Sequence, residues 1–226
     1  MKFLDYIFYD RKTNWTALCL FASFTLFYAL MNAPYVVYIA DQAQVLGAYT
    51  PFNTQQFPLN LFNFDPSMYY GANSSSVIHP LISFLVVTLG AVSQLLGGNW
   101  FFLILQSLIN AGSVVLVFLF LNQKDRQIIT PLLFAALFGC SSYLMFTALI
   151  PDSYPYVQFF ILWSVLYMQY TRERDDVRYV PNALLATVNF GLTSTNIVPL
   201  AAAMFFNLRT WRKASTWKKY IGIMAL

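Results

Sequence analysis

Four ionisable side chains in this 226-residue chain stand apart from its basic residues. They are Asp41, Asp65, His79 and Asp152. The other acidic residues lie beside lysines and arginines, where solvation and pairing account for them. A carboxylate just above the end of an apolar helix, with little solvent around it, is suited to act as a general base. Carboxylates and an imidazole can also bind a divalent metal, and the sequence leaves open whether a metal is present.

Asp41 and Asp65 differ in their surroundings. Asp41 follows Tyr38 and Ile39, beyond the end of the first apolar run, and we favour a catalytic role for it over that of a solvated loop residue. Asp65 precedes Pro66, and an Asp-Pro pair is typical of a turn. We therefore interpret Asp65 as a structural residue.

His79 and Asp152 each precede a predicted helix. His79 is followed by Pro80, a residue that favours the first turn of a helix, and both a structural and a functional role stay open. Asp152 is placed to cap the helix that begins near Tyr154. The cap is compatible with a second role in orienting a phosphate or a metal.

The composition places most of the chain in lipid. Hydrophobic residues make up 58% and charged residues 10%, against about 25% charged in soluble domains. The net charge is +4, but the basic residues form short clusters between apolar runs, so nucleic-acid binding is excluded. Cys19 and Cys140 lie inside apolar runs, which predicts packing rather than a disulfide framework.

The apolar runs predict an all-α, polytopic transmembrane bundle. They span Trp15–Met31, Leu81–Leu96, Trp100–Leu121, Ile128–Ile150, Tyr154–Tyr170 and Ala183–Phe206. A further run starts at Tyr220, and we expect it to continue beyond Leu226. Residues 1–226 are thus expected to be the N-terminal part of a single membrane module.

The 13 lysines and arginines fix the predicted topology. All of them fall on one side if Leu81–Leu96 does not cross the membrane and Ala183–Phe206 crosses twice as a broken pair. Gly191, Pro199 and the polar residues Thr193–Asn196 favour such a break. The positive-inside rule then predicts a multi-pass membrane protein with a cytoplasmic N-terminus and an external loop over residues 32–99 that contains juxtamembrane helices.

The order and sidedness of these motifs resemble the GT-C superfamily of membrane glycosyltransferases, and in particular its aminoarabinose-transferase and protein O-mannosyltransferase branch with its bacterial relatives. The shared features are an acidic residue after the first helix, a His-Pro motif that opens a juxtamembrane helix, a Pro-Asp turn after the third helix, and a broken helix pair. Here they are Asp41, His79-Pro80-Leu81, Pro151-Asp152 and Leu192–Pro199. The lysine that the family often carries in the last motif is missing.

The resemblance implies a cell-envelope enzyme of the plasma (inner) membrane that uses a sugar on a polyprenyl phosphate, with a glycan, lipid or protein hydroxyl as acceptor. It implies Asp41 as the base for direct, inverting displacement, which needs no second nucleophilic carboxylate. Substrate contacts are expected from His79, Asp152, Thr195 and Asn196. Some members use a divalent metal and others do not.

Two other interpretations stay open. A transporter or flippase of lipid-linked sugars would also have broken helices and polar residues at membrane depth, but we would expect ionisable groups inside several of its helices. A structural subunit would need no set of external acidic residues.

Overall fold

The structure, a computed structural model, describes residues 2–46, 80–125, 128–149, 153–174, 178–207 and 214–225. Every regular element among these residues is helical, as predicted. The helices are α1 (Phe3–Ile7), α2 (Arg11–Leu46), α4 (Ile82–Leu95), α5 (Asn99–Asp125), α6 (Ile129–Gly139), α7 (Ser142–Leu149), α8 (Tyr154–Arg174), α9 (Tyr179–Leu192), the 3-10 turn η2 (Ser194–Asn196), α10 (Ile197–Asn207) and α11 (Ala214–Met224).

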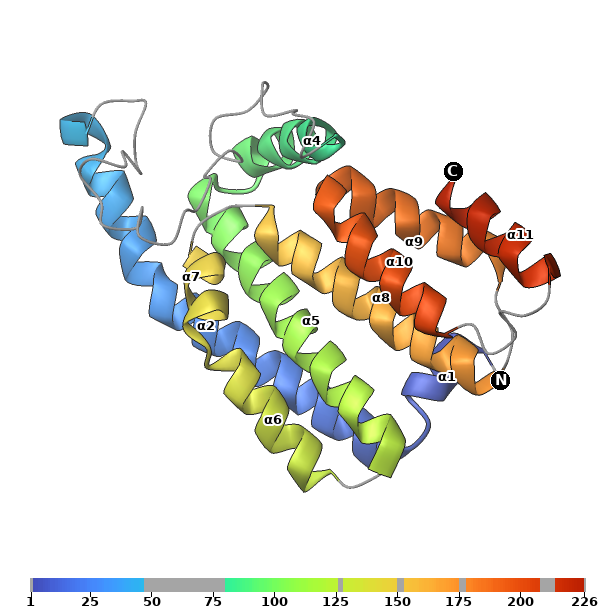
Figure 1. The fold of residues 1–226 in the computed structure, drawn as a ribbon. Coiled ribbons are helices and arrows are strands. Elements are labelled where there is room, and N and C mark those ends of the chain that lie inside the picture. Colours follow the sequence, from blue (N-terminus) through green and yellow to red (C-terminus); the bar gives the residue numbers. More distant parts are fainter. Residues whose placement is uncertain are drawn as a thin grey trace.

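The centre of the bundle is α5, which packs between α2, α6 and α8 (Figure 1). Its apolar side chains Phe118 and Leu119 are fully buried with Tyr28 of α2, Leu144 of α7 and Leu166 of α8. Among the described helices, Arg11–Pro34 and Trp100–Gln123 are long and apolar enough to cross a membrane, and the bent pair α6–α7 would make a third span.

The second half of α2 corrects the sequence prediction. A loop was expected from Asn32 onward, but the chain remains helical to Leu46 and passes through Pro34 without ending the helix. The prediction ended the first helix with the apolar run at Met31, whereas the helix continues even through a proline, a residue that disfavours a helix interior. The helix continues because apolar residues follow Pro34, and the alanines and glutamines of residues 40–44 are neutral or good helix formers. Val36 is also buried.

The predicted third helix, Ile128–Ile150, is not continuous. It bends by 58° between α6 and α7. Gly139 at the end of α6 lies against the ring of Phe24, which occupies the space that a side chain there would need. The Tyr28 hydroxyl donates a hydrogen bond of 2.7 Å to the Gly139 carbonyl, so a backbone acceptor at the break has a partner.

The predicted break in Ala183–Phe206 is confirmed. Helix α9 ends at Leu192, Thr193 is extended with φ −155° and ψ 117°, and η2 leads into α10. The chain reverses direction there, so that α9 and α10 form a short hairpin beside α8 (Figure 1).

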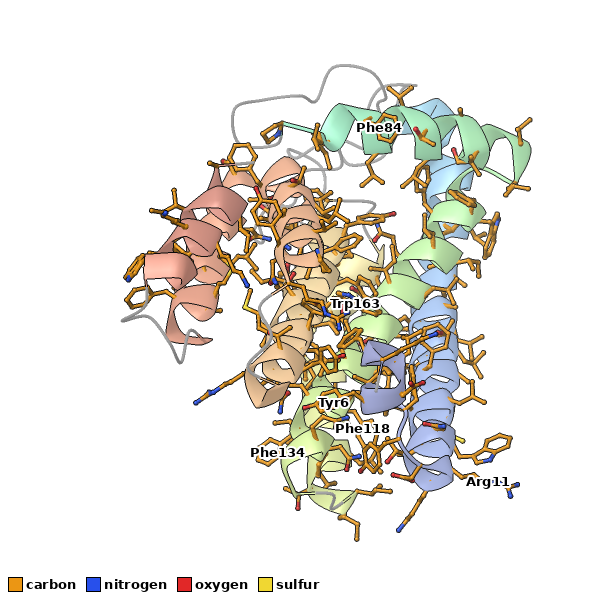
Figure 2. The ribbon with its side chains drawn as sticks, turned by 90° about the vertical axis from the view of Figure 1, so that its right-hand side faces the viewer. Tyr6, Arg11, Phe84, Phe118, Phe134 and Trp163 are labelled. Atoms are coloured by element: carbon orange, nitrogen blue, oxygen red, sulfur yellow. The ribbon has the colours of Figure 1, made fainter. Side chains whose placement is uncertain are left out.

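The two ends of the bundle differ in character. Helix α4 lies across one end, with Phe84 on it, and Arg11 at the start of α2 marks the other end (Figure 2). At the Arg11 end, the Asn122 amide of α5 donates hydrogen bonds to the hydroxyls of Tyr9 (3.0 Å) and Thr13 (3.1 Å). Phe3 of α1 contacts the Tyr170 ring of α8 at a centroid distance of 5.3 Å. The start of α2, the end of α5 and the end of α8, which carry three of the basic clusters, therefore meet at one end.

Candidate functional site at the α4 end of the bundle

The first residues of α4 are attached to the end of α9. The Leu81 amide donates a hydrogen bond of 2.7 Å to the Gly191 carbonyl. The Leu81 side chain also covers the Cα of Gly191, where a Cβ would lie 2.7 Å from Leu81 Cγ and 3.0 Å from Leu81 Cβ. A side chain at position 191 would overlap Leu81 in its present position, so glycine favours this close approach. This contact fixes the chain immediately after His79-Pro80.

A small buried cluster joins four helices at this junction. It contains Ile82 of α4, Phe102 of α5, Tyr156 of α8 and Leu192 of α9. Each is at most 7% exposed, so the four helix ends pack as one unit. Ile82, Tyr156 and Leu192 are close in sequence to His79, Asp152 and Thr195, respectively. Packing of this cluster therefore joins three helix ends that are far apart in the chain.

The break between α9 and α10 supplies polar groups at the junction. Thr195 is exposed and Asn196 is half-buried. The Asn196 backbone amide donates to the Thr193 carbonyl at 2.9 Å, whereas its buried side-chain Nδ2 has no hydrogen-bond partner in the described part of the chain. A buried donor without a partner is unfavourable, so Asn196 is suited to donate to an oxygen of a bound molecule.

Asp41 lies in the last turns of α2 rather than in a loop, and its side chain is outside the described residues. Figure 1 shows the end of α2 at the same end of the molecule as α4 but apart from it. The described part of α2 packs mainly against α5 and α7. The structure therefore places the backbone of Asp41 at the α4 end of the bundle, without bringing it to the α4–α9 junction.

His79, Asp152 and Asp65 lie outside the described residues. The residue after Asp152 is Ser153, which is buried and whose carbonyl accepts a hydrogen bond of 3.0 Å from the Val157 amide at the start of α8. Within the described ranges, no group of three or more His, Cys, Asp or Glu side chains could hold a metal ion.

Buried amides inside the bundle are the feature that the sequence analysis missed. Asn110 of α5 is fully buried and its Nδ2 donates to the Leu144 carbonyl at 3.0 Å and to Thr147 Oγ1 at 3.1 Å. Asn189 of α9 donates to Ser164 Oγ of α8 at 2.9 Å. The sequence signal that could have revealed them is an asparagine within an apolar run. The hydrogen bonds of Asn110 connect α5 to α7 and that of Asn189 connects α9 to α8, so we assign both residues to holding the broken helices in place.

Three comparisons, with models of protein families, with curated proteins and with solved structures, found no match to this chain.

Proposed function

We propose that this chain is the membrane module of a glycosyltransferase that takes a sugar from a polyprenyl phosphate on the external face of the plasma (inner) membrane. The supporting observation is the junction at the α4 end, where the start of α4 packs against the end of α9 and the η2 turn follows directly after α9. In the proposed topology the N-terminus and the basic clusters are cytoplasmic, so this junction is external.

In the proposed reaction, Asp41 removes the proton from an acceptor hydroxyl. The hydroxyl oxygen then attacks the anomeric carbon, the bond from that carbon to the phosphate oxygen breaks, and the polyprenyl phosphate leaves with the electron pair. Because the attack is direct, the anomeric configuration inverts. The glycosyl acceptor is a glycan, a lipid or a protein.

Thr195 and Asn196 are proposed as substrate-binding groups. The exposed Thr195 hydroxyl can donate or accept a hydrogen bond, and the Asn196 amide can donate one. Phosphate or sugar oxygens suit both groups. His79 and Asp152 are proposed to complete the site, because their neighbours Leu81, Ile82 and Ser153 lie at or beside the same junction.

A transporter of lipid-linked sugars is the second candidate, and the two broken helix pairs favour it. Against it, the apolar stretches of residues 13–40, 100–123, 153–171 and 179–207 contain no Asp, Glu, Lys, Arg or His. A carrier that couples transport to ions or moves an anionic phosphate would be expected to hold charged groups at membrane depth. The absence of such groups within these stretches leads us to prefer the enzyme.

The distinguishing experiment uses the purified full-length protein in vesicles with a polyprenyl phosphate that carries a radiolabelled hexose. The enzyme moves the label from the lipid into an acceptor fraction prepared from membranes, whereas a transporter only exposes the labelled lipid on the other leaflet. Thr195→Val should lower transfer, and Thr187→Val, an exposed threonine on α9, is the matched control. Movement of the intact lipid without sugar transfer would contradict the proposal.

A further inference from the structure

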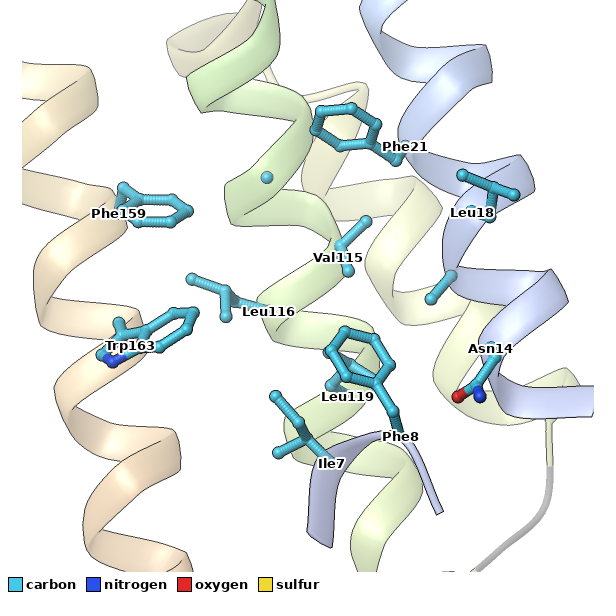
Figure 3. Close-up of a pocket in the computed structure, with 12 residues that line it drawn as sticks. Ile7, Phe8, Asn14, Leu18, Phe21, Val115, Leu116, Leu119, Phe159 and Trp163 are labelled. Atoms are coloured by element: carbon cyan, nitrogen blue, oxygen red, sulfur yellow. The ribbon is translucent and has the colours of Figure 1, made fainter. Parts of the chain in front are cut away.

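An apolar groove runs along the side of the bundle at the end opposite the candidate site. It has a volume of about 510 Å³ and lies between α2 and α8, with α5 as its floor (Figure 3). Leu18 and Phe21 of α2 form one wall and Phe159 and Trp163 of α8 form the other. The size falls within the range of about 300–1,000 Å³ that is usual for ligand sites.

The short helix α1 closes one end of this groove. Ile7 and Phe8 contribute to the lining, while Phe3 packs edge-on against Trp163 at a centroid distance of 5.5 Å. Asn14 is the one polar residue of the lining. The groove would therefore present hydrocarbon along its length and an amide near the α1 end.

Two cations lie at the same end of α2. Arg11 precedes Asn14, Leu18 and Phe21 at the spacing that places residues on one face of a helix. It lies at the start of α2, with its side chain directed away from the bundle (Figure 2). Arg11 and Lys12 are exposed, and neither has an ion-pair partner among the described residues. The adjacent Asp10 carboxylate accepts hydrogen bonds from the Thr13 amide (2.8 Å) and hydroxyl (2.7 Å), which leaves it less available to pair with these cations.

We propose that the groove binds one acyl chain of an anionic phospholipid, with the phosphate held by Arg11 and Lys12. Helices α2 and α5 are the two long apolar helices of the described structure, so the groove between them and α8 would open toward lipid. Basic residues at the end of such a groove suit an anionic headgroup. The Asn14 amide is placed to donate to a lipid ester carbonyl. This site is independent of the proposed transferase activity.

The test compares phosphatidylglycerol with phosphatidylcholine of identical acyl chains, bound to the full-length protein in detergent and counted by native mass spectrometry. We expect phosphatidylglycerol to bind more tightly. Arg11→Gln should weaken that preference about five-fold, the effect of one basic residue near an anionic headgroup. Arg172→Gln, which removes an exposed cation at the end of α8, should leave the preference unchanged.

Filling the groove should remove the site for both lipids. Leu18 and Leu26 are both on α2 and are 55% and 59% exposed, but only Leu18 lines the groove. Leu18→Trp should abolish the bound lipid, and Leu26→Trp should not. Equal binding of the two lipids by the wild type, or normal binding by Leu18→Trp, would overturn the proposal. A photo-reactive residue at position 18 that cross-links to a second protein copy instead of a lipid would also overturn it.

Discussion

Replacing Gly191 by alanine should loosen the α4 end of the bundle. The new Cβ would overlap the Leu81 side chain and lie 3.0 Å from Leu81 Cβ. Leu81 is 50% exposed, so its outer carbons can rotate away. Its Cβ cannot, because the backbone of Leu81 is held by the hydrogen bond to the Gly191 carbonyl. The start of α4 must therefore shift and lengthen that bond.

The expected size of the effect follows from three terms. Overpacking costs about 1–3 kcal/mol, and losing the hydrogen bond adds about 1 kcal/mol. Alanine in place of glycine within a helix stabilises it by about 0.5–1 kcal/mol, which offsets part of this cost. We expect a net destabilisation of the junction of about 1–3.5 kcal/mol. Hydrogen exchange at the Leu81 amide should then be faster by about five-fold to a few hundred-fold, since a ten-fold change corresponds to about 1.4 kcal/mol.

The assay is hydrogen exchange with mass spectrometry on peptides that cover residues 80–90, with unfolding midpoints measured in the same detergent. Gly90→Ala is the matched control, because a Cβ at Gly90 meets no atom within 4 Å; it should be neutral or slightly stabilising. Exchange at Leu81 that is unchanged in Gly191→Ala would refute the close contact from which this reasoning starts.

Three further predictions concern the rest of the bundle. Gly139→Ala should lower the unfolding free energy by about 1–3 kcal/mol, because its Cβ would lie 2.9 Å or less from the Phe24 ring; a denaturant titration with no change would contradict this. Tyr28→Phe should cost about 1–3 kcal/mol, since a buried carbonyl at the α6–α7 break loses its donor; the same titration measures it. Hydrogen bonds from the backbone of Thr13 lower the pKa of the Asp10 carboxyl. The ionised Asp10 carboxyl therefore stabilises the fold above the ordinary Asp pKa of about 4, and this stabilisation is lost as the pH falls through the lower pKa that Asp10 has in the folded protein. Asp10→Asn should therefore lose less stability on acidification than the wild type, which unfolding midpoints measured over a pH series would show.

The elements that were predicted correctly are those with local signals. The apolar runs of α5 and α8 are long and end at charged residues. The α9–α10 break is marked in sequence by Gly191, Pro199 and four polar residues between them. Each of these signals depends on residues within a few turns of the feature itself, so a single sequence is sufficient to find it.

The elements that were missed depend on contacts between distant residues. Gly139 alone does not break a helix, and the bend there is accompanied by contacts with Phe24 and Tyr28, which belong to a different helix. The apolar run ends at Met31, but α2 continues to Leu46, and Val36 in this continuation is buried. Likewise, nothing in the segment after His79 predicts that Leu81 would bond to Gly191. The sequence supplies candidate residues for a site, whereas the contact that joins α4 to α9 has no local signal.

The most direct test of the central claim is the rate of sugar transfer by Asp41→Asn in the purified full-length protein. If Asp41 is the general base, transfer from the labelled polyprenyl phosphate should fall by about 10²–10⁴-fold, with folding and membrane insertion intact. Asp65→Asn, predicted to affect only a turn, should retain most activity and serves as the control. Near-normal turnover by Asp41→Asn would contradict the account. Inactivity of Asp152→Asn in its place would move the chemistry to the start of α8.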